Sequence, residues 1–196
     1  MSEAGFDRMP YVILDFKREE LINGIERAEY ILPHEKIPKH PGIYILPITF
    51  GQDDELEHWF WKVHRHKNVG LFIDEGYMVP VRRGLRALLT QGRSLHIPMT
   101  ILTQRPTGCT PFIHSEADFH CLFPLNDQDD IKRALRHCPR DPVVHPAWDM
   151  EKRLEKYHAR WYDVGEDFSA ELKPVPTAEK ILARFEQKLK PKRRWI

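Results

Sequence analysis

Two adjacent carboxylates, Asp74 and Glu75, directly follow the apolar run Val69–Ile73. A short run rich in Val, Ile and Phe predicts a strand that is buried on both faces of a parallel sheet. Open α/β sheets bind ligands beyond the carboxyl ends of their strands, so charges at this position indicate a functional site. The chemistry that fits is phosphoryl transfer from a nucleotide, in which Asp74 holds Mg²⁺ through water and Glu75 acts as general base.

Polar side chains also follow two other strand-like runs. Asp15 closes the first of these runs and Lys17 comes just after it, whereas Gln104 and Arg105 end the second. The carboxyl ends of parallel strands share one edge of a sheet, so we expect these groups to converge on the acid pair. A neutral amide such as Gln104 can orient a water or sense the γ-phosphate, because it both donates and accepts hydrogen bonds. The alternative is that each strand simply runs out into a solvated loop.

The elements that would position these residues alternate between strands and helices. Strand-like runs cover residues 11–16, 42–48, 69–73, 98–104 and 118–123, followed by a hairpin of 159–164 and 168–172. Helical spacing covers residues 53–67, 80–90, 127–138 and a stretch that begins at 177. This alternation predicts an α/β fold with a parallel sheet flanked by helices and a small C-terminal hairpin and helix. We expect two domains, a core at 1–145 and an appendage at 146–196 that ends in a basic tail.

Composition restricts the class of protein further. The chain has 196 residues, of which 41% are hydrophobic, and its net charge of +1 gives no general attraction to nucleic acid or membrane. No apolar run approaches the roughly 20 residues that a membrane span requires, and the N-terminus lacks the pattern of a signal peptide. The three cysteines form no CxxC pair and suit reduced thiols. We therefore expect a cytoplasmic protein.

Several motifs resemble one known family. Residues 71–75 look like a Walker B segment, and 91–97 running into 101–106 are similar to the "GR…gI" turn and "TQRP" strand of the FtsK–HerA class of P-loop ATPases. Residues 11–17 resemble the "vviDpK" strand of the same class. The resemblance covers residues 11–134, and the block from the glycine-arginine turn to the proline is its most specific part.

The resemblance implies a RecA-like core, ATP and Mg²⁺ as cofactors, DNA as partner, and assembly into a ring, usually a hexamer. It favours a DNA-pumping motor of a phage or mobile element, of the kind that packages DNA. In such a site Asp74 would organise Mg²⁺, Glu75 would activate water and Gln104 would sense the γ-phosphate. Arg93 would reach the nucleotide of a neighbouring subunit, a role for which it is preferred over Arg105. Arg105 would bind the nucleotide or, with equal weight, pair with a carboxylate near the sheet edge.

One part of the family pattern is missing, because no GxxxxGK[ST] loop occurs in these 196 residues. That loop cradles the phosphates and supplies the lysine and hydroxyl that bind ATP and its magnesium. Three explanations stay open: a start codon placed too late, a domain completed by another chain, or a degenerate homologue that does not hydrolyse ATP. In the last case the chain would be a structural module that joins a ring or binds DNA without turnover. A weaker alternative is an unrelated α/β enzyme that uses the acid pair as plain acid and base.

Two basic features could contact DNA. Arg82, Arg86 and Arg93 would share one helix face if the helix continued past Gly92, and would form a ridge for phosphates. The alternative is a solvated helix face. The tail at 188–194 is also strongly basic, and a frayed terminus is the alternative there.

Overall fold

The computed structural model describes residues 5–49, 51–139, 141, 143–149 and 154–189. Its internal contacts divide the chain into two compact units. The first unit combines residues 1–103 with 177–196, and the second consists of residues 104–176. This boundary differs from the expected division into 1–145 and 146–196, since the last helix packs in the first unit. The expected domain division remains a prediction.

The first unit is built on a five-stranded sheet whose order is β2-β3-β1-β4-β5 and whose strands are all parallel. Its strands are β1 (Pro10–Asp15), β2 (Glu29–Tyr30), β3 (Gly42–Pro47), β4 (Gly70–Ile73) and β5 (Met99–Ile101). The apolar runs in the sequence predict four of these strands, and only the short β2 was not expected. The parallel sheet flanked by helices confirms the predicted fold class.

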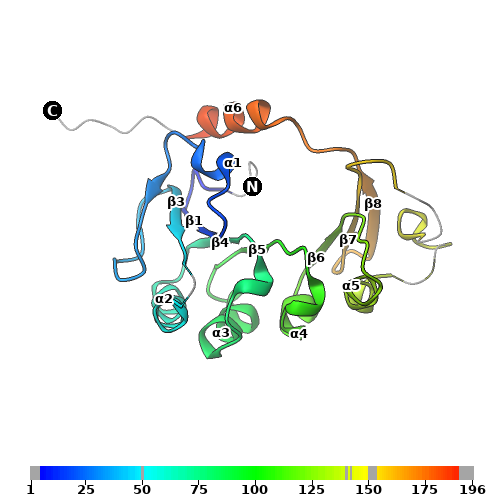
Figure 1. The fold of residues 1–196 in the computed structure, drawn as a ribbon, viewed down its shortest axis with the longest axis horizontal. Coiled ribbons are helices and arrows are strands. Elements are labelled where there is room, and N and C mark those ends of the chain that lie inside the picture. The colour runs from blue at the N-terminus through cyan, green and yellow to red at the C-terminus, as the bar shows by residue number, and fades with distance from the viewer. Residues whose placement is uncertain (1–4, 50, 140, 142, 150–153, 190–196) are drawn as a thin grey trace. The chain divides into compact units, whose positions relative to one another are not determined.

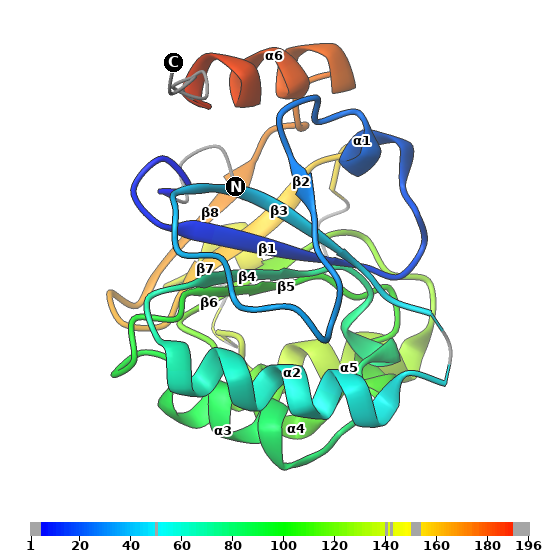
Figure 2. The same ribbon diagram turned by 90° about the vertical axis from the view of Figure 1, so that its left-hand side faces the viewer.

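Helices cover both faces of this sheet, as Figures 1 and 2 show. Helices α2 (Asp53–His66) and α3 (Arg83–Gln91) lie on one face, and α1 (Glu20–Asn23) and α6 (Ala178–Lys188) lie on the other. Because both faces are covered, the central strand β1 is buried along its whole length. Parallel strands in such positions are apolar on both sides, which explains the unbroken hydrophobic runs in the sequence.

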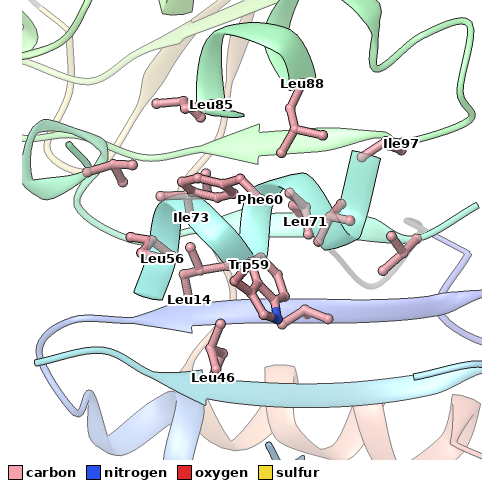
Figure 3. Close-up of a cluster of buried hydrophobic side chains, with 14 of the residues drawn as sticks. Leu14, Leu46, Leu56, Trp59, Phe60, Leu71, Ile73, Leu85, Leu88 and Ile97 are labelled. Atoms are coloured by element: carbon pink, nitrogen blue, oxygen red, sulfur yellow. The ribbon is translucent and has the colours of Figure 1, made fainter. Parts of the chain in front are cut away.

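Two apolar clusters follow from the alternation of side chains along β1. Val12 and Leu14 point into the cluster beneath α2 and α3, whereas Tyr11 and Ile13 point into the cluster beneath α6. Figure 3 shows the first cluster, in which Trp59 of α2 packs against the sheet. Residues labelled there are Leu14, Leu46, Leu56, Trp59, Phe60, Leu71, Ile73, Leu85, Leu88 and Ile97.

The long helix α2 forms where the sequence predicts it, because its charges complement the helix dipole. Three acids, Asp53, Asp54 and Glu55, occupy its first turn, and basic residues occupy its last. Helix α3 begins at Arg83, three residues later than expected, and Gly92 follows its end. The condition for a continuous ridge of arginines is therefore not met. Arg82 lies before the helix and forms an ion pair with Asp54 instead.

The second unit carries a three-stranded antiparallel sheet of order β6-β7-β8. Its elements are η2 (Pro106–Gly108), α4 (Pro111–Ser115), β6 (Phe119–Leu122), α5 (Gln128–Ala134), η3 (Leu135–His137), η4 (Pro146–Trp148), β7 (Ala159–Asp163) and β8 (Phe168–Leu172). The expected hairpin of β7 and β8 is confirmed. The strand predicted at 118–123 forms as β6, and it pairs antiparallel with β7 in the smaller sheet. Asp127 caps α5 by accepting hydrogen bonds from the amides of Asp129 and Asp130.

The structure also bears on the expected basic tail and on the expected lack of a membrane span. Most of the basic tail, residues 190–196, lies outside the described residues, whereas Lys188 is the last residue of α6. None of the helices in the described part of the chain has the length and apolarity that a bilayer span requires.

Candidate functional site

The acid pair lies at the carboxyl edge of the parallel sheet, directly after β4. The amide of Asp74 donates to the carbonyl of Leu14 at 3.3 Å, which continues the pairing of β4 with β1. On the other side, the amide of Gly76 donates to the carbonyl of Leu102 at 2.6 Å. These bonds hold the chain between its two neighbours, so Asp74 and Glu75 keep a defined position where strands β1, β4 and β5 end.

Glu75 is a strained and buried residue. Its backbone has φ 61° and ψ 61°, the left-handed conformation that non-glycine residues rarely adopt. Its exposed fraction is 2%, yet it carries a carboxylate. Oε1 accepts a hydrogen bond from the ammonium of Lys17, and Oε2 has no hydrogen-bond partner among the described residues. Strain and an unpaired buried oxygen are both features that concentrate at functional sites.

Asp74 is half-buried beside several charges. Burial raises the pKa of its carboxyl, and the nearby carboxylates of Glu19 and Asp15 raise it too, whereas the ammonium of Lys17 opposes the shift. Its Oδ2 has no hydrogen-bond partner within the described part of the chain. A second positive charge, such as a bound cation, would therefore stabilise the ionised form of Asp74.

Asp15 has a different role at the same edge. Its Oδ1 accepts hydrogen bonds from the amides of Arg18, at 2.7 Å, and Glu19, at 3.4 Å. Arg18 itself has φ 60°, so these bonds stabilise a tight turn after β1. This turn brings the side chain of Lys17 to Glu75. Asp15 thus shapes the edge of the sheet.

The residues at this edge suit part of what a magnesium nucleotide requires. Asp15, Asp74 and Glu75 each keep one buried carboxylate oxygen without a partner among the described residues. Oxygen ligands are those that Mg²⁺ prefers, and it usually takes only one or two carboxylates and retains several waters. No group of three or more His, Cys, Asp or Glu in the described residues could hold a metal by itself. A hollow of about 30 Å³ beside Phe16 and Met78 is too small for a nucleotide, and the phosphate-cradling loop is not in the sequence.

Gln104 and Arg105 belong to the second unit, and both side chains are exposed. The Nε of Arg105 lies 3.6 Å from Oδ2 of the buried Asp130. Hydrogen bonds from the hydroxyl and amide of Thr107 lower the pKa of Asp130, and the charge of Arg105 adds to this effect. Arg105 thus pairs with a carboxylate of α5 in its own unit, whereas the expected alternative was a carboxylate near the sheet edge. Its role in nucleotide binding and that of Gln104 remain predictions.

Arg93 lies in the exposed turn that follows α3. Gly92 makes this turn possible, since a Cβ there would clash with the carbonyl of Leu88. The side chain is thus carried by a tight turn at the surface, a position compatible with contact to another subunit. Its role in trans remains a prediction.

Lys17 contacts Glu75 directly, which agrees with the expected convergence of the groups at this edge, although the sequence alone assigned it no role in the chemistry. The available signal was its position, two residues after the end of the strand that pairs with β4. Parallel register places residues that follow Leu14 beside those that follow Ile73. A cation at that offset is therefore a natural partner for an acid after β4.

A curated relative covers almost the whole chain. The sequence is 40% identical over 190 residues to the DNA packaging ATPase P9 of Enterobacteria phage PRD1, across 95% of this chain and 83% of the relative. The chain belongs to the family of phage DNA-packaging ATPases. The expected class of packaging-type P-loop ATPases is thereby confirmed. No family model matches the sequence.

Solved structures of packaging enzymes share the fold of this packaging ATPase family member. The genome packaging NTPase B204 of Sulfolobus turreted icosahedral virus 2, in complex with sulfate, aligns with a TM-score of 0.64 and 19% identity over 86% of this chain and 82% of that one. The same NTPase in complex with AMPPCP aligns with a TM-score of 0.57 and 16% identity over 87% of this chain and 100% of that one. At these identities the likeness shows the fold alone.

Proposed function

We propose that the protein is a subunit of an ATP-hydrolysing motor that packages phage DNA. The observation that carries this proposal is the acid pair at the end of β4, in which a strained, buried Glu75 keeps one carboxylate oxygen unpaired among the described residues. Membership in the packaging ATPase family supports the reaction, and the nucleotide complexes of the B204 NTPase support ATP as the ligand. By the same family likeness, the subunits form a homo-oligomeric ring that acts on DNA in the host cytoplasm.

Each site residue has a role in this proposal. Asp74 would hold Mg²⁺ through water, and Glu75 would accept the proton of the attacking water at Oε2 while Lys17 fixes the carboxylate through Oε1. Gln104 senses the γ-phosphate and Arg93 reaches the nucleotide of the neighbouring subunit. When bound, ATP would supply the phosphoryl group and Mg²⁺ would supply positive charge to its phosphates.

The proposal requires a phosphate-binding loop, and we propose that residues outside this sequence contribute it. Strand β5 supports this idea, because it is last in the sheet order and pairs only with β4 among the described residues. Its side chains at Met99 and Ile101 are only half-buried, unlike those of the central β1. A further strand that leads into such a loop could therefore pair with this edge of the sheet.

The direct test is the substitution Glu75→Gln in a form of the protein that includes the phosphate-binding loop. We expect the variant to bind ATP as the wild type does and to hydrolyse it at least about 100-fold more slowly, because the general base is lost. Glu179→Gln, which makes the same change at an exposed acid of helix α6, serves as a matched control. Unchanged turnover in Glu75→Gln would remove Glu75 from its proposed role.

A second candidate function is a module that joins a packaging ring or binds DNA without hydrolysing ATP. The missing GxxxxGK[ST] loop favours this candidate. Calorimetric titration of the 196-residue chain with ATP and Mg²⁺ separates the two functions when the measurement is repeated with the loop present. Heat of binding that arises only with the loop supports the motor, and no heat in either form supports the module.

A further inference from the structure

A hollow of about 290 Å³ lies on the second unit, beside the ion pair of Arg105 with Asp130. It is lined by Thr107, Asp129, Lys132, Arg133 and Arg136. All five residues belong to the second unit. Three cations and one anion line it, so the hollow is positively charged although the whole chain is nearly neutral.

The positive charge of the hollow is available to a ligand. Lys132 and Arg136 are exposed and lie four residues apart along α5 and η3, on the same side of the helical stretch. Asp129 contacts Lys132 at 3.4 Å, but the two side chains are 80% and 74% exposed. Such an exposed pair is screened by water and contributes little. A stronger anion can therefore replace Asp129 as the partner of Lys132.

The remaining residues fix the shape of the hollow and add no competing acceptor. The Nη2 of Arg133 donates to the carbonyl of Cys109 at 3.3 Å, which anchors the guanidinium. The hydroxyl and the amide of Thr107 both donate to Asp130, at 2.7 and 2.8 Å, so Asp130 is already satisfied. Recognition by this surface thus depends on charge carried by the three basic side chains.

We propose that this basic hollow, formed by Lys132, Arg133 and Arg136, binds phosphodiester groups of the DNA backbone. Side-chain cations without base-reading amides are typical of contacts that position a protein on DNA regardless of sequence, as a packaging motor requires. A nucleotide site would also need a nest of backbone amides for the phosphates, whereas three of the five residues that line this hollow offer side-chain cations. This inference rests on the DNA-binding part of the proposed function and assigns it a surface.

The test measures binding of a fluorescently labelled DNA duplex by anisotropy at several NaCl concentrations. We expect Lys132→Gln combined with Arg136→Gln to weaken binding about tenfold near 100 mM salt. The slope of log affinity against log salt should fall in magnitude by about 1 to 2, because each lost phosphate contact on duplex DNA removes about 0.9. Lys180→Gln combined with Arg184→Gln on α6 makes the same change of charge on the first unit and should leave both values unchanged.

A second variant keeps the inference testable if the double substitution disturbs folding. Asp129→Asn removes the one acid among the described residues that line the hollow and releases Lys132, so we expect DNA to bind several-fold more tightly with a steeper salt dependence. Glu166→Gln, in the exposed turn between β7 and β8, is its matched control. It should bind as the wild type does.

The outcomes separate this inference from the proposed function. If the wild type binds DNA and neither hollow variant changes the affinity, the inference is overturned and the proposed motor function stands. If the wild type does not bind DNA even at about 20 mM salt, the inference falls together with the DNA part of that function, whereas ATP hydrolysis is tested independently. Displacement of the duplex by ATP beyond the effect of ionic strength, seen only with an intact hollow, would assign the hollow to nucleotide phosphates and overturn the inference as well.

Discussion

Replacing Lys17 by Met should destabilise the first unit, because it leaves the carboxylate of Glu75 buried without its counter-charge. The side chain of Glu75 is 3% exposed and that of Lys17 is 33% exposed. Removing one partner of a fully buried ion pair costs about 3–5 kcal/mol. Since water reaches the ammonium of Lys17 and screens part of the interaction, we expect a loss of about 2 kcal/mol in the free energy of unfolding.

A double-mutant cycle separates this effect from a simple loss of packing. Glu75→Gln alone should cost about 1 kcal/mol or less, since Lys17 can then turn to solvent. With both substitutions present, stability should be close to that of Glu75→Gln alone, which gives a coupling energy of about 2 kcal/mol, the full cost of Lys17→Met. Amide hydrogen exchange in peptides that cover β1 and β4 reports opening of this sheet. A Lys17→Met variant within about 0.5 kcal/mol of the wild type, or strictly additive effects, would refute the reasoning.

Further predictions address the core and the titrating groups. Gly70→Ala should cost about 2–3 kcal/mol, because the added methyl overlaps the buried ring of Tyr11, and chemical denaturation should show the cost nearly vanish in a Tyr11→Ala background. Asp74→Asn should stabilise the fold at pH 7 by about 0.5–1 kcal/mol. Because the pKa of Asp74 is raised in the folded state, its ionised form opposes folding at pH values above the pKa of the unfolded chain. The gain in stability should therefore shrink as pH falls through the pKa of the folded state. An unchanged thermal midpoint at pH 7 would contradict this prediction. Burial lowers the pKa of His120 to about 4, so the free energy of unfolding should fall as pH drops from 6.5 toward 4. His120→Gln should reduce the loss of unfolding free energy at pH 5 by about 1 kcal/mol, a value lowered to allow for the partial exposure of the ring to solvent. Urea titrations that give the same pH profile for both proteins would count against this prediction.

Local patterns in the sequence were sufficient to predict most helices and strands of the first unit. Helix α2 carries its own evidence, since acids open it, bases close it and apolar residues repeat at helical spacing. Strand β6 has no such evidence for its partner. Its pairing with β7 joins residues about 40 positions apart, as in the register of Cys121 with Trp161, and a strand pattern contains no information about register over that distance.

The sequence predicts the residues of the candidate site that directly follow a buried strand, but not the contacts that their side chains make. The position of Asp74 and Glu75 follows from one buried run and from the shared edge of parallel strands. The contact of Lys17 with Glu75 depends on a tight turn after β1, and the contact of Arg105 with Asp130 depends on how α5 packs. Both are tertiary contacts between residues far apart in the chain. The positions of the charges in the sequence do not tell which acid Lys17 or Arg105 contacts in the folded chain.

Helix α6 has a consequence for the order in which the protein is made. Synthesis from the N-terminus produces all five strands of the parallel sheet, and then the whole second unit, before α6 emerges. Phe185 and Leu189 then pack on Phe6 and Tyr11, which until that moment have no cover from α6. The growing chain therefore carries a bare apolar surface for most of its translation, a state that favours aggregation and chaperone binding. The strands of the sheet are made early, and the helix that covers one of its faces is made last.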